Sequence, residues 1–228
     1  MRIFTVIPAR GGSKSIPKKN IQLLNRKPLL QYSVEYSLKC DLVEKTIVST
    51  DSKEIAEVAK NCGAEVPFIR PSELARDDTP DYPVFRHALD YLEKEYNVNI
   101  DLIILLRPTS PLRPPGLIER GIKLFDKYPD STSIRCVTFT SEHPYRQWIK
   151  NGNYIKGLIE NVHEPYNLER QELPVVYFQS GDIEIVKRQT LIDGSISGNK
   201  VLPLIINHQE MYDIDYEHDL KRAEKSLQ

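Results

Sequence analysis

Short apolar runs alternate with longer stretches of helical periodicity over the first 140 residues, and this alternation constrains the fold more than any other feature. The apolar runs have the length of buried strands and lie at residues 3–7, 45–49, 65–69, 102–106 and 133–139. The helical stretches end near residues 37, 61, 96 and 128, and Asp51 is the expected N-cap of the second. This alternation predicts right-handed βαβ units and an α/β fold with a mostly parallel sheet. The run 102–106 is apolar throughout, which favours a central strand covered on both faces.

The pattern changes after about residue 140. Residues 143–181 are rich in Tyr, Asn, Glu, Arg and Pro, and Asn151-Gly152-Asn153 is typical of a hairpin turn. We interpret this stretch as a small arm or lobe inserted into a single domain of residues 1–228, with the chain returning to the sheet near residue 182. A strand and an amphipathic helix then complete the domain, at about residues 201–206 and 216–227.

Composition narrows the class of protein. The formal net charge of −1 argues against non-specific nucleic-acid binding, which needs a large positive field. The three cysteines are too far apart to form a disulfide framework or a metal cluster, which favours a reducing compartment. No apolar stretch approaches the length needed to cross a bilayer. We therefore expect a cytoplasmic protein that binds neither nucleic acid nor membranes.

The loop after the first strand, residues 8–20, is called the basic loop below. It lies where ligands of α/β proteins bind, beyond the carboxyl end of a strand. Gly11 and Gly12 let the backbone approach a ligand, and Ser13 adds a hydroxyl donor. Four cations accompany them: Arg10, Lys14, Lys18 and Lys19. This chemistry suits a triphosphate, although neither the Walker spacing nor the dinucleotide fingerprint is present; the alternative is a solvated basic loop.

Two aspartates near the carboxyl end of the chain, Asp213 and Asp215, are separated by one residue. In an extended segment this spacing places both carboxylates on one face. Paired carboxylates beside a triphosphate provide the oxygen ligands that Mg²⁺ prefers. The alternative is that Asp215 caps the final helix.

Several motifs in the same order resemble those of the acylneuraminate cytidylyltransferase family. The resemblance covers nearly the whole chain and rests on Ile7–Lys14 with Lys19-Asn20, Ser49–Asp51, Arg70–Ala75, Arg107–Arg113, Arg170–Pro174 and Asp213–Asp215. It implies a Rossmann-like nucleotidyltransferase fold with a dimerisation arm, a homodimer, and the joining of CTP to an acidic 3-deoxy-2-keto sugar with release of pyrophosphate. It also implies Mg²⁺ as the cofactor, held by Asp213 and Asp215.

The resemblance assigns roles position by position. It makes Arg10, Ser13 and Lys19 ligands of the CTP phosphates, with Ala9, Gly11 and Gly12 in the same nucleotide-binding stretch. Asn20 would contact the ribose, and Arg70 would lie near the base. Arg10, Lys19 and Asp215 would be catalytic: the two cations stabilise charge on the leaving pyrophosphate, and Asp215 holds the metal ion that activates the attacking hydroxyl.

The sugar side of the site needs cations for a carboxylate, and arginine is the best bidentate partner. We expect Arg107, Arg146 and Arg170 to contact the sugar; Arg113 is a further candidate, with a surface position as its alternative. The sequence departs from the family pattern at three positions of the expected sugar pocket. Many members have Gln at the position of Arg107, Arg is common at the position of Phe178, and Tyr is common at the position of Glu184. These exchanges place Glu184 in the expected sugar pocket and leave sialic, legionaminic and pseudaminic acids open as substrates.

Two other functions remain open. A sugar-1-phosphate nucleotidyltransferase shares the sheet and the glycine-rich first loop, but its nucleophile is a phosphate. A catalytically silent nucleotide-binding relative would keep the fold without turnover. The arm also has an alternative role: it can be a self-packed lobe instead of a dimer contact, and Arg170 can hold it through a structural ion pair.

Overall fold

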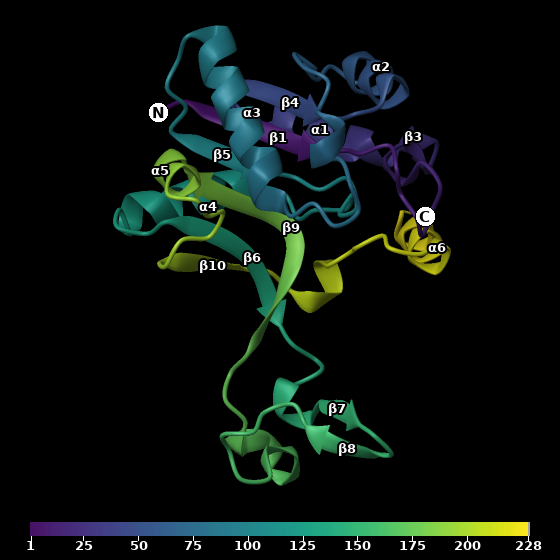
Figure 1. The fold of residues 1–228 in the computed structure, drawn as a ribbon, viewed down its shortest axis with the longest axis vertical. Coiled ribbons are helices and arrows are strands. Elements are labelled where there is room, and N and C mark those ends of the chain that lie inside the picture. Colours follow the sequence, from purple (N-terminus) through teal and green to yellow (C-terminus); the bar gives the residue numbers. More distant parts are fainter. Residues whose placement is uncertain (228) are drawn as a thin grey trace.

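The computed structural model describes residues 1–227 and contains one central six-stranded sheet in the order β10-β6-β9-β5-β1-β4 (Figure 1). Its strands are β1 (Ile3–Pro8), β4 (Lys45–Ser49), β5 (Leu102–Leu105), β6 (Ser133–Phe139), β9 (Tyr177–Lys187) and β10 (Val201–Ile205). Strand β9 is antiparallel to both neighbours, whereas the other three pairings are parallel. This is the mostly parallel α/β sheet that the alternation predicts.

Helices cover both faces of the sheet. They are α1 (Leu29–Leu38), α2 (Lys53–Asn61), α3 (Asp81–Tyr96), α4 (Leu117–Lys127), α5 (Arg188–Ile192) and α6 (Glu217–Ser226). Apolar residues of α1, α2 and α4 share one core cluster with the sheet, and those of α3 and α5 share another. All four residues of β5 are buried between these clusters, which confirms the central strand expected from the run 102–106.

Two local expectations are wrong, and one small hairpin was not expected. Residues 65–69 form a single bridge, Ile47 to Glu65, and no strand, because Pro67 has no N–H to continue a ladder. The N-cap of α2 is Ser52, whose hydroxyl accepts from the Ile55 amide at 3.4 Å; Asp51 is turned towards the basic loop. A small hairpin, β2 (Leu23–Leu24) and β3 (Lys27–Pro28), precedes α1, and Pro28 is the N-cap of that helix.

The arm extends from the lower end of the molecule in Figure 1 and contains the hairpin β7 (Trp148–Asn151) and β8 (Tyr154–Gly157). Gly152 has a φ of 61° in the turn, so the hairpin signal is confirmed. The chain rejoins the sheet at Tyr177, where β9 pairs with Phe139 of β6, and not near residue 182 as expected. The early return makes residues 177–187 a long strand that carries the arm. No helix within residues 1–227 is long and apolar enough to cross a membrane.

Candidate active site

A cleft of about 400 Å³ opens beyond the carboxyl end of β1, and is called the main cleft below. Its walls come from the basic loop, from residues 70–84 that lead into α3, and from residues 107–109 that follow β5. These segments follow β1, β4 and β5, which are adjacent in the sheet, so parallel pairing alone brings them together. The cleft collects six of the predicted site residues: Arg10, Ser13, Lys19, Asn20, Arg70 and Arg107.

The backbone of the basic loop is held by neighbouring strands. The Ala9 amide donates to the Ser49 carbonyl at 2.9 Å, and the Gly11 amide donates to the Asp51 carboxylate at 2.8 Å. A Cβ on Gly11 would lie 3.2 Å from the Ser52 Cβ, so glycine permits the close approach of loop and helix. The buried Asn20 amide donates to the Arg10 carbonyl at 2.9 Å, which fixes the far side of the loop. The loop is therefore shaped before any ligand binds.

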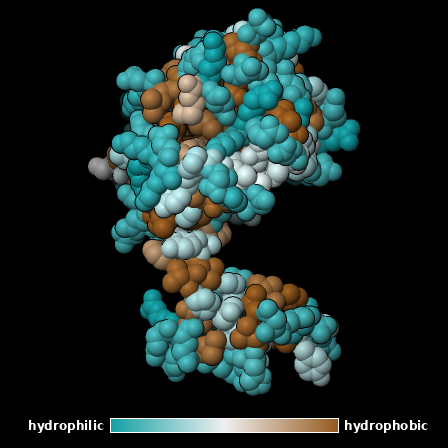
Figure 2. Space-filling model, turned by 90° about the vertical axis from the view of Figure 1, so that its left-hand side faces the viewer, coloured by the Kyte–Doolittle hydropathy of each residue, from teal (hydrophilic) through white to brown (hydrophobic). Residues whose placement is uncertain are grey.

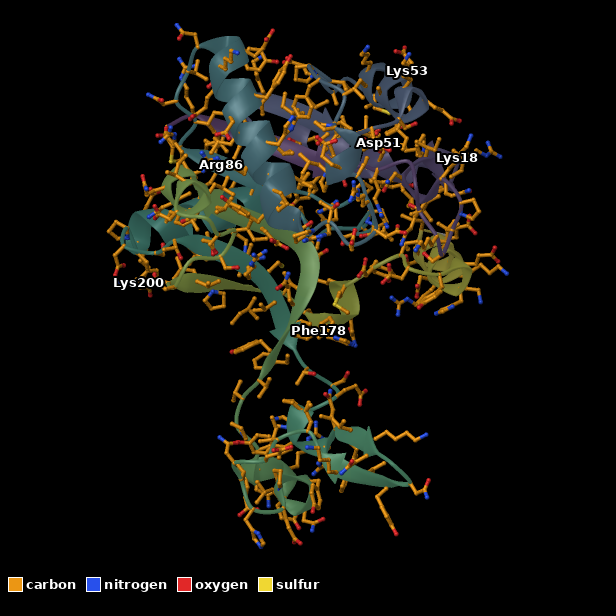
Figure 3. All side chains as sticks on the ribbon, in the orientation of Figure 1. Lys18, Asp51, Lys53, Arg86, Phe178 and Lys200 are labelled. Carbon is orange, nitrogen blue, oxygen red and sulfur yellow. The ribbon has the colours of Figure 1, made fainter. Side chains whose placement is uncertain are left out.

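The cations of the basic loop are paired with carboxylates. Arg10 contacts Asp77 at 2.6 Å, and Lys14 contacts the other oxygen of the same carboxylate. Lys14 and Arg10 together hold the pKa of Asp77 below its usual value. Lys18 pairs with Glu54 at 2.7 Å, away from the lining of the cleft, at the outer edge of the loop in Figure 3. Arg10 and Lys14 thus converge on one anion inside the cleft, which is the behaviour expected of a phosphate site.

The two aspartates approach the basic loop from the opposite end of the chain. Lys19 donates to the Asp215 carboxylate at 2.9 Å and to the Ile214 carbonyl at 3.0 Å, and the Ile214 amide donates to the Thr109 carbonyl at 2.8 Å. Burial, and then the nearby Asp215 charge, raise the pKa of Asp213. A divalent cation between Asp213 and Asp215 would offset the repulsion between their two negative charges. Residues 1–227 contain no cluster of three or more potential ligands, so such an ion would complete its shell with phosphate and water oxygens.

The alternative role for Asp215, capping α6, is wrong. The Asp219 carboxylate accepts from the Asp215 amide at 3.0 Å and from the Tyr216 amide at 2.9 Å. Asp219 therefore satisfies the start of α6 and leaves the Asp215 side chain free to face Lys19.

Arg70 is almost fully buried at the wall of the main cleft, with 4% of its surface exposed. Its Nε donates to the Ser49 hydroxyl at 3.0 Å, and another nitrogen donates to the Ser49 carbonyl. Burial lowers the pKa of Arg70 to about 10, which leaves it charged at neutral pH. A charged donor fixed at the cleft wall suits a ligand with acceptor atoms.

Arg107 is held between two carboxylates. Its Nη1 donates to Glu184 at 2.5 Å and its Nη2 donates to Asp81 at 2.5 Å. Glu184 is 4% exposed and also contacts Arg135 on β6 and the Gln179 amide. Glu184 therefore lies behind Arg107 and does not line the cleft. Sequence analysis missed Asp81 and Arg135, and only the strand register, which pairs Arg135 with Glu184, would have revealed the second.

Arg113 is buried, which excludes the surface position given as its alternative. Its guanidinium donates to the Asp182 carbonyl at 2.5 Å, to the Ser33 hydroxyl at 3.0 Å and to the Arg107 carbonyl at 2.5 Å. Arg113 thus fixes the loop that presents Arg107 and Thr109. Burial raises the pKa of the neighbouring Asp182 carboxyl to about 6.

Two predicted site residues lie elsewhere. Arg146 and Arg170 line a second hollow of about 660 Å³, formed by residues 139–147 and 170–176 where the arm joins the body. Within residues 1–227 neither forms an ion pair, so Arg170 does not hold the arm in the way its alternative required. A single chain therefore does not unite these arginines with the main cleft.

Comparisons with known proteins agree on one family. A family model described as cytidylyltransferase matches residues 4–225. The CMP-N,N'-diacetyllegionaminic acid synthase of Legionella pneumophila subsp. pneumophila is 35% identical over 236 residues, covering 100% of this chain and 97% of the relative. The N-acylneuraminate cytidylyltransferase of Escherichia coli O18:K1:H7 is 30% identical over 223 residues, covering 97% of this chain and 51% of the relative.

A solved structure has the same fold. The CMP:2-keto-3-deoxy-manno-octonic acid synthetase complexed with CTP aligns with a TM-score of 0.73 and 17% identity, covering 100% of this chain and 98% of that chain. At this level of identity the likeness shows a shared architecture, which agrees with the predicted Rossmann-like nucleotidyltransferase fold.

Proposed function

Because this chain belongs to the cytidylyltransferase family, we propose that it joins CTP to an acidic 3-deoxy-2-keto sugar, giving a CMP-sugar and pyrophosphate. One observation carries the proposal: the Lys19–Asp215 ion pair joins the basic loop to the paired aspartates across 196 residues of sequence. The cations that we propose to bind phosphates and the carboxylates that we propose to hold a metal ion are therefore joined through Lys19, which lines the main cleft. Chemistry at the α-phosphorus of a nucleoside triphosphate needs these two groups side by side.

The side chains support the following mechanism. Arg10, Lys14 and Lys19 bind the β- and γ-phosphates and stabilise the charge that develops on pyrophosphate as it leaves. Asp213 and Asp215 would hold Mg²⁺, which supplies polarisation of the α-phosphate and a lower pKa for the attacking anomeric hydroxyl. Asn20 and Arg70 orient the nucleoside. No nucleophilic side chain is required, because the sugar hydroxyl attacks directly.

The acceptor is proposed to be a nonulosonic acid of the sialic, legionaminic or pseudaminic type. Relatives named for N,N'-diacetyllegionaminic acid and N-acylneuraminate support this class without choosing within it. The free cysteines of the described chain support a reducing compartment, and we propose the cytoplasm.

We also propose a homodimer in which the arm of one protomer completes the site of the other. The arm and its junction with the body expose apolar side chains, which appear as brown patches in Figure 2. Val175 and Phe178 are exposed apolar residues, and Phe178 lies at the junction in Figure 3; the aromatic side chains of Trp148 and Tyr154 are exposed as well. Exposed aromatic and arginine side chains are enriched at interfaces, and Arg146 and Arg170 supply cations for a sugar carboxylate.

The test is pyrophosphate release in the presence of Mg²⁺, with each of the four nucleoside triphosphates crossed with N-acetylneuraminic, legionaminic, pseudaminic and 3-deoxy-manno-octulosonic acids. A sugar-1-phosphate serves as the control acceptor. We expect release with CTP and one keto acid. Release only with the sugar phosphate would identify the rival nucleotidyltransferase, and CTP binding without release on any acceptor would identify a silent relative.

A further inference from the structure

The segment 71–80 forms part of the wall of the main cleft and is called the strap below. It begins and ends at a proline and leads into α3. Within residues 1–227, the strap amides that donate backbone hydrogen bonds donate to carbonyls of the strap itself: Leu74 to Pro71, Ala75 to Ser72 and Thr79 to Arg76. The strap is therefore not tied to the sheet by its own amides, and its contact with the basic loop depends on side chains.

Asp77 holds the strap against the basic loop through both of its carboxylate oxygens. One oxygen contacts the Arg10 guanidinium at 2.6 Å, and the other contacts the Lys14 ammonium group. All three side chains line the main cleft. Arg10 and Lys14 are also the cations that the proposed function assigns to the β- and γ-phosphates. The Asp77 carboxylate and a triphosphate therefore need the same donors.

The contact between Asp77 and the two cations is of the kind that an incoming anion can replace. The side chain of Asp77 is 40% exposed and that of Lys14 is 79% exposed. Ion pairs between exposed side chains are weak, because water competes for both partners. A polyphosphate carries several negative charges where the carboxylate carries one, so it attracts the same two cations more strongly.

We propose that the strap is a latch on the phosphate site: the Asp77 carboxylate competes with phosphates for Arg10 and Lys14, and it leaves them when a triphosphate binds. This inference rests on the proposed function, in that these cations are taken as the phosphate site, and goes beyond it by making access to that site conditional. The apparent affinity for any polyphosphate is then lowered by the fraction of molecules in which the latch is closed.

The latch also bears on the end of the reaction. Pyrophosphate, as it leaves, gives up the two cations that Asp77 can take back. The returning carboxylate opposes the rebinding of pyrophosphate and so weakens inhibition by this product. A residue that lowers the affinity for the substrate CTP is therefore expected to speed the release of the other anion that uses the same donors.

Asp78 is the matched control, since it is the next residue of the strap and is likewise an exposed aspartate. It does not line the main cleft, and within residues 1–227 it forms no ion pair. Replacing either aspartate with asparagine removes one negative charge from the strap. Only the change at Asp77 removes the competitor as well.

Calorimetric titration of the full-length protein with pyrophosphate and with CTP, each in the presence of Mg²⁺, tests the latch. We expect Asp77→Asn to bind both anions about 3- to 10-fold more tightly than the wild type, because two exposed ion pairs no longer oppose binding. Asp78→Asn should remain within about twofold of the wild type. Inhibition of turnover by pyrophosphate should become stronger in Asp77→Asn by the same factor as its binding.

Asp77→Ser is a second variant, whose short side chain carries no charge and cannot bridge the two cations. An unchanged or lower affinity for either anion in either Asp77 variant would overturn the inference. Equal tightening in Asp78→Asn would also overturn it, because the effect would then come from the charge of the strap and not from the contact of Asp77. A wild type that binds neither pyrophosphate nor CTP would instead contradict the proposed function.

Discussion

The main cleft and the arm hold their functional side chains in different ways. In the cleft, the side chains of Asn20 and Arg70 are buried and hydrogen-bonded to backbone atoms of neighbouring strands and loops. In the arm, every residue of β7 is exposed, and the Arg146 guanidinium has a single hydrogen-bond partner within residues 1–227, the Leu168 carbonyl at 3.2 Å. One chain is thus sufficient to fix the geometry of the cleft, whereas the hairpin of the arm packs on the arm itself, with the Trp148 and Tyr166 ring centroids 4.3 Å apart. The difference is what the proposed homodimer would explain, with the nucleotide half of the site built within one protomer and the sugar half completed by another.

The largest expected effect concerns the cleft alone. Asp215→Ala should reduce turnover by about 1,000-fold, because it removes one of two carboxylates available for the metal ion. Its side chain is 60% exposed, so the free energy of unfolding should change by less than about 1 kcal/mol. Pyrophosphate release and urea unfolding measure the two quantities.

Asp193→Ala is the control for Asp215→Ala, since Asp193 is an exposed aspartate that accepts from Gln189 far from the cleft. It should retain full turnover. Wild-type turnover in an Asp215→Ala protein that unfolds cooperatively would show that this carboxylate does not hold the metal.

The next effect concerns the arm. Arg170→Ala should lower kcat/KM for the keto acid by about 10- to 100-fold and leave the affinity for CTP unchanged, since arginine is the expected partner of the sugar carboxylate. Lys156→Ala is the control: Lys156 is in the same arm but pairs with the Glu160 carboxylate at the surface. Steady-state kinetics with varied sugar gives the first quantity, and calorimetry gives the second.

Mixing the two impaired variants, Asp215→Ala and Arg170→Ala, tests whether the arm acts across a dimer. If it does, a heterodimer of Asp215→Ala and Arg170→Ala has one site with both defects and one site with neither. The mixture should therefore be more active than either variant alone. A mixture no more active than the sum of its parts would place Arg170 in the site of its own protomer and remove the contrast between arm and cleft.

The sequence predicted the cleft better than its surroundings for physical reasons. Parallel βα units place the loops after successive strands on one sheet edge, so motifs in these loops could be assembled without coordinates. Long-range contacts could not be predicted. Asp81 and Arg135 join Arg107 and Glu184 through the sheet order, in which β9 inserts between β5 and β6.

Local competition explains the other differences. Asp51 and Ser52 are both residue types that cap helices well. Ser52 is the N-cap of α2, because the Asp51 carboxylate instead accepts a hydrogen bond from the Gly11 amide. Arg113 lies in a loop rich in proline, where a surface position is the ordinary expectation. Its burial follows from the carbonyl groups of Arg107 and Asp182, which the fold turns towards it.

The third prediction concerns the buried Asp182 carboxylate, whose negative charge is expected to lower the free energy of unfolding. Burial raises the pKa of Asp182 to about 6, so the folded chain binds more protons than the unfolded chain between about pH 4 and pH 6. The destabilisation from this carboxylate therefore grows as the pH rises and is complete above about pH 7. Asp182→Asn should gain about 2 kcal/mol of stability at pH 8 relative to pH 4.5, measured by urea unfolding.

Asp130→Asn serves as the control for that measurement, because Asp130 is exposed and pairs with Lys200 at 2.6 Å, which lowers the pKa of Asp130. This variant should show no gain at high pH. A pH-independent difference between Asp182→Asn and the wild type would mean that Asp182 is not a source of strain beneath the cleft.

The smallest effect compares one hydroxyl beside the cleft with one at the root of the arm. Ser52 caps α2 through the Ile55 amide, so Ser52→Ala should cost about 1 kcal/mol of stability. Ser141 is an exposed residue that lines the second hollow, where the arm joins the body. Replacing it with alanine should lower the free energy of unfolding by less than about 0.5 kcal/mol. Since Ser52 lies against Gly11 but outside the cleft lining, the affinity of Ser52→Ala for CTP should remain within about twofold of the wild type. A larger loss of CTP affinity would show that the basic loop depends on the cap of α2, and that the cleft is less firmly fixed within one chain than its backbone contacts indicate.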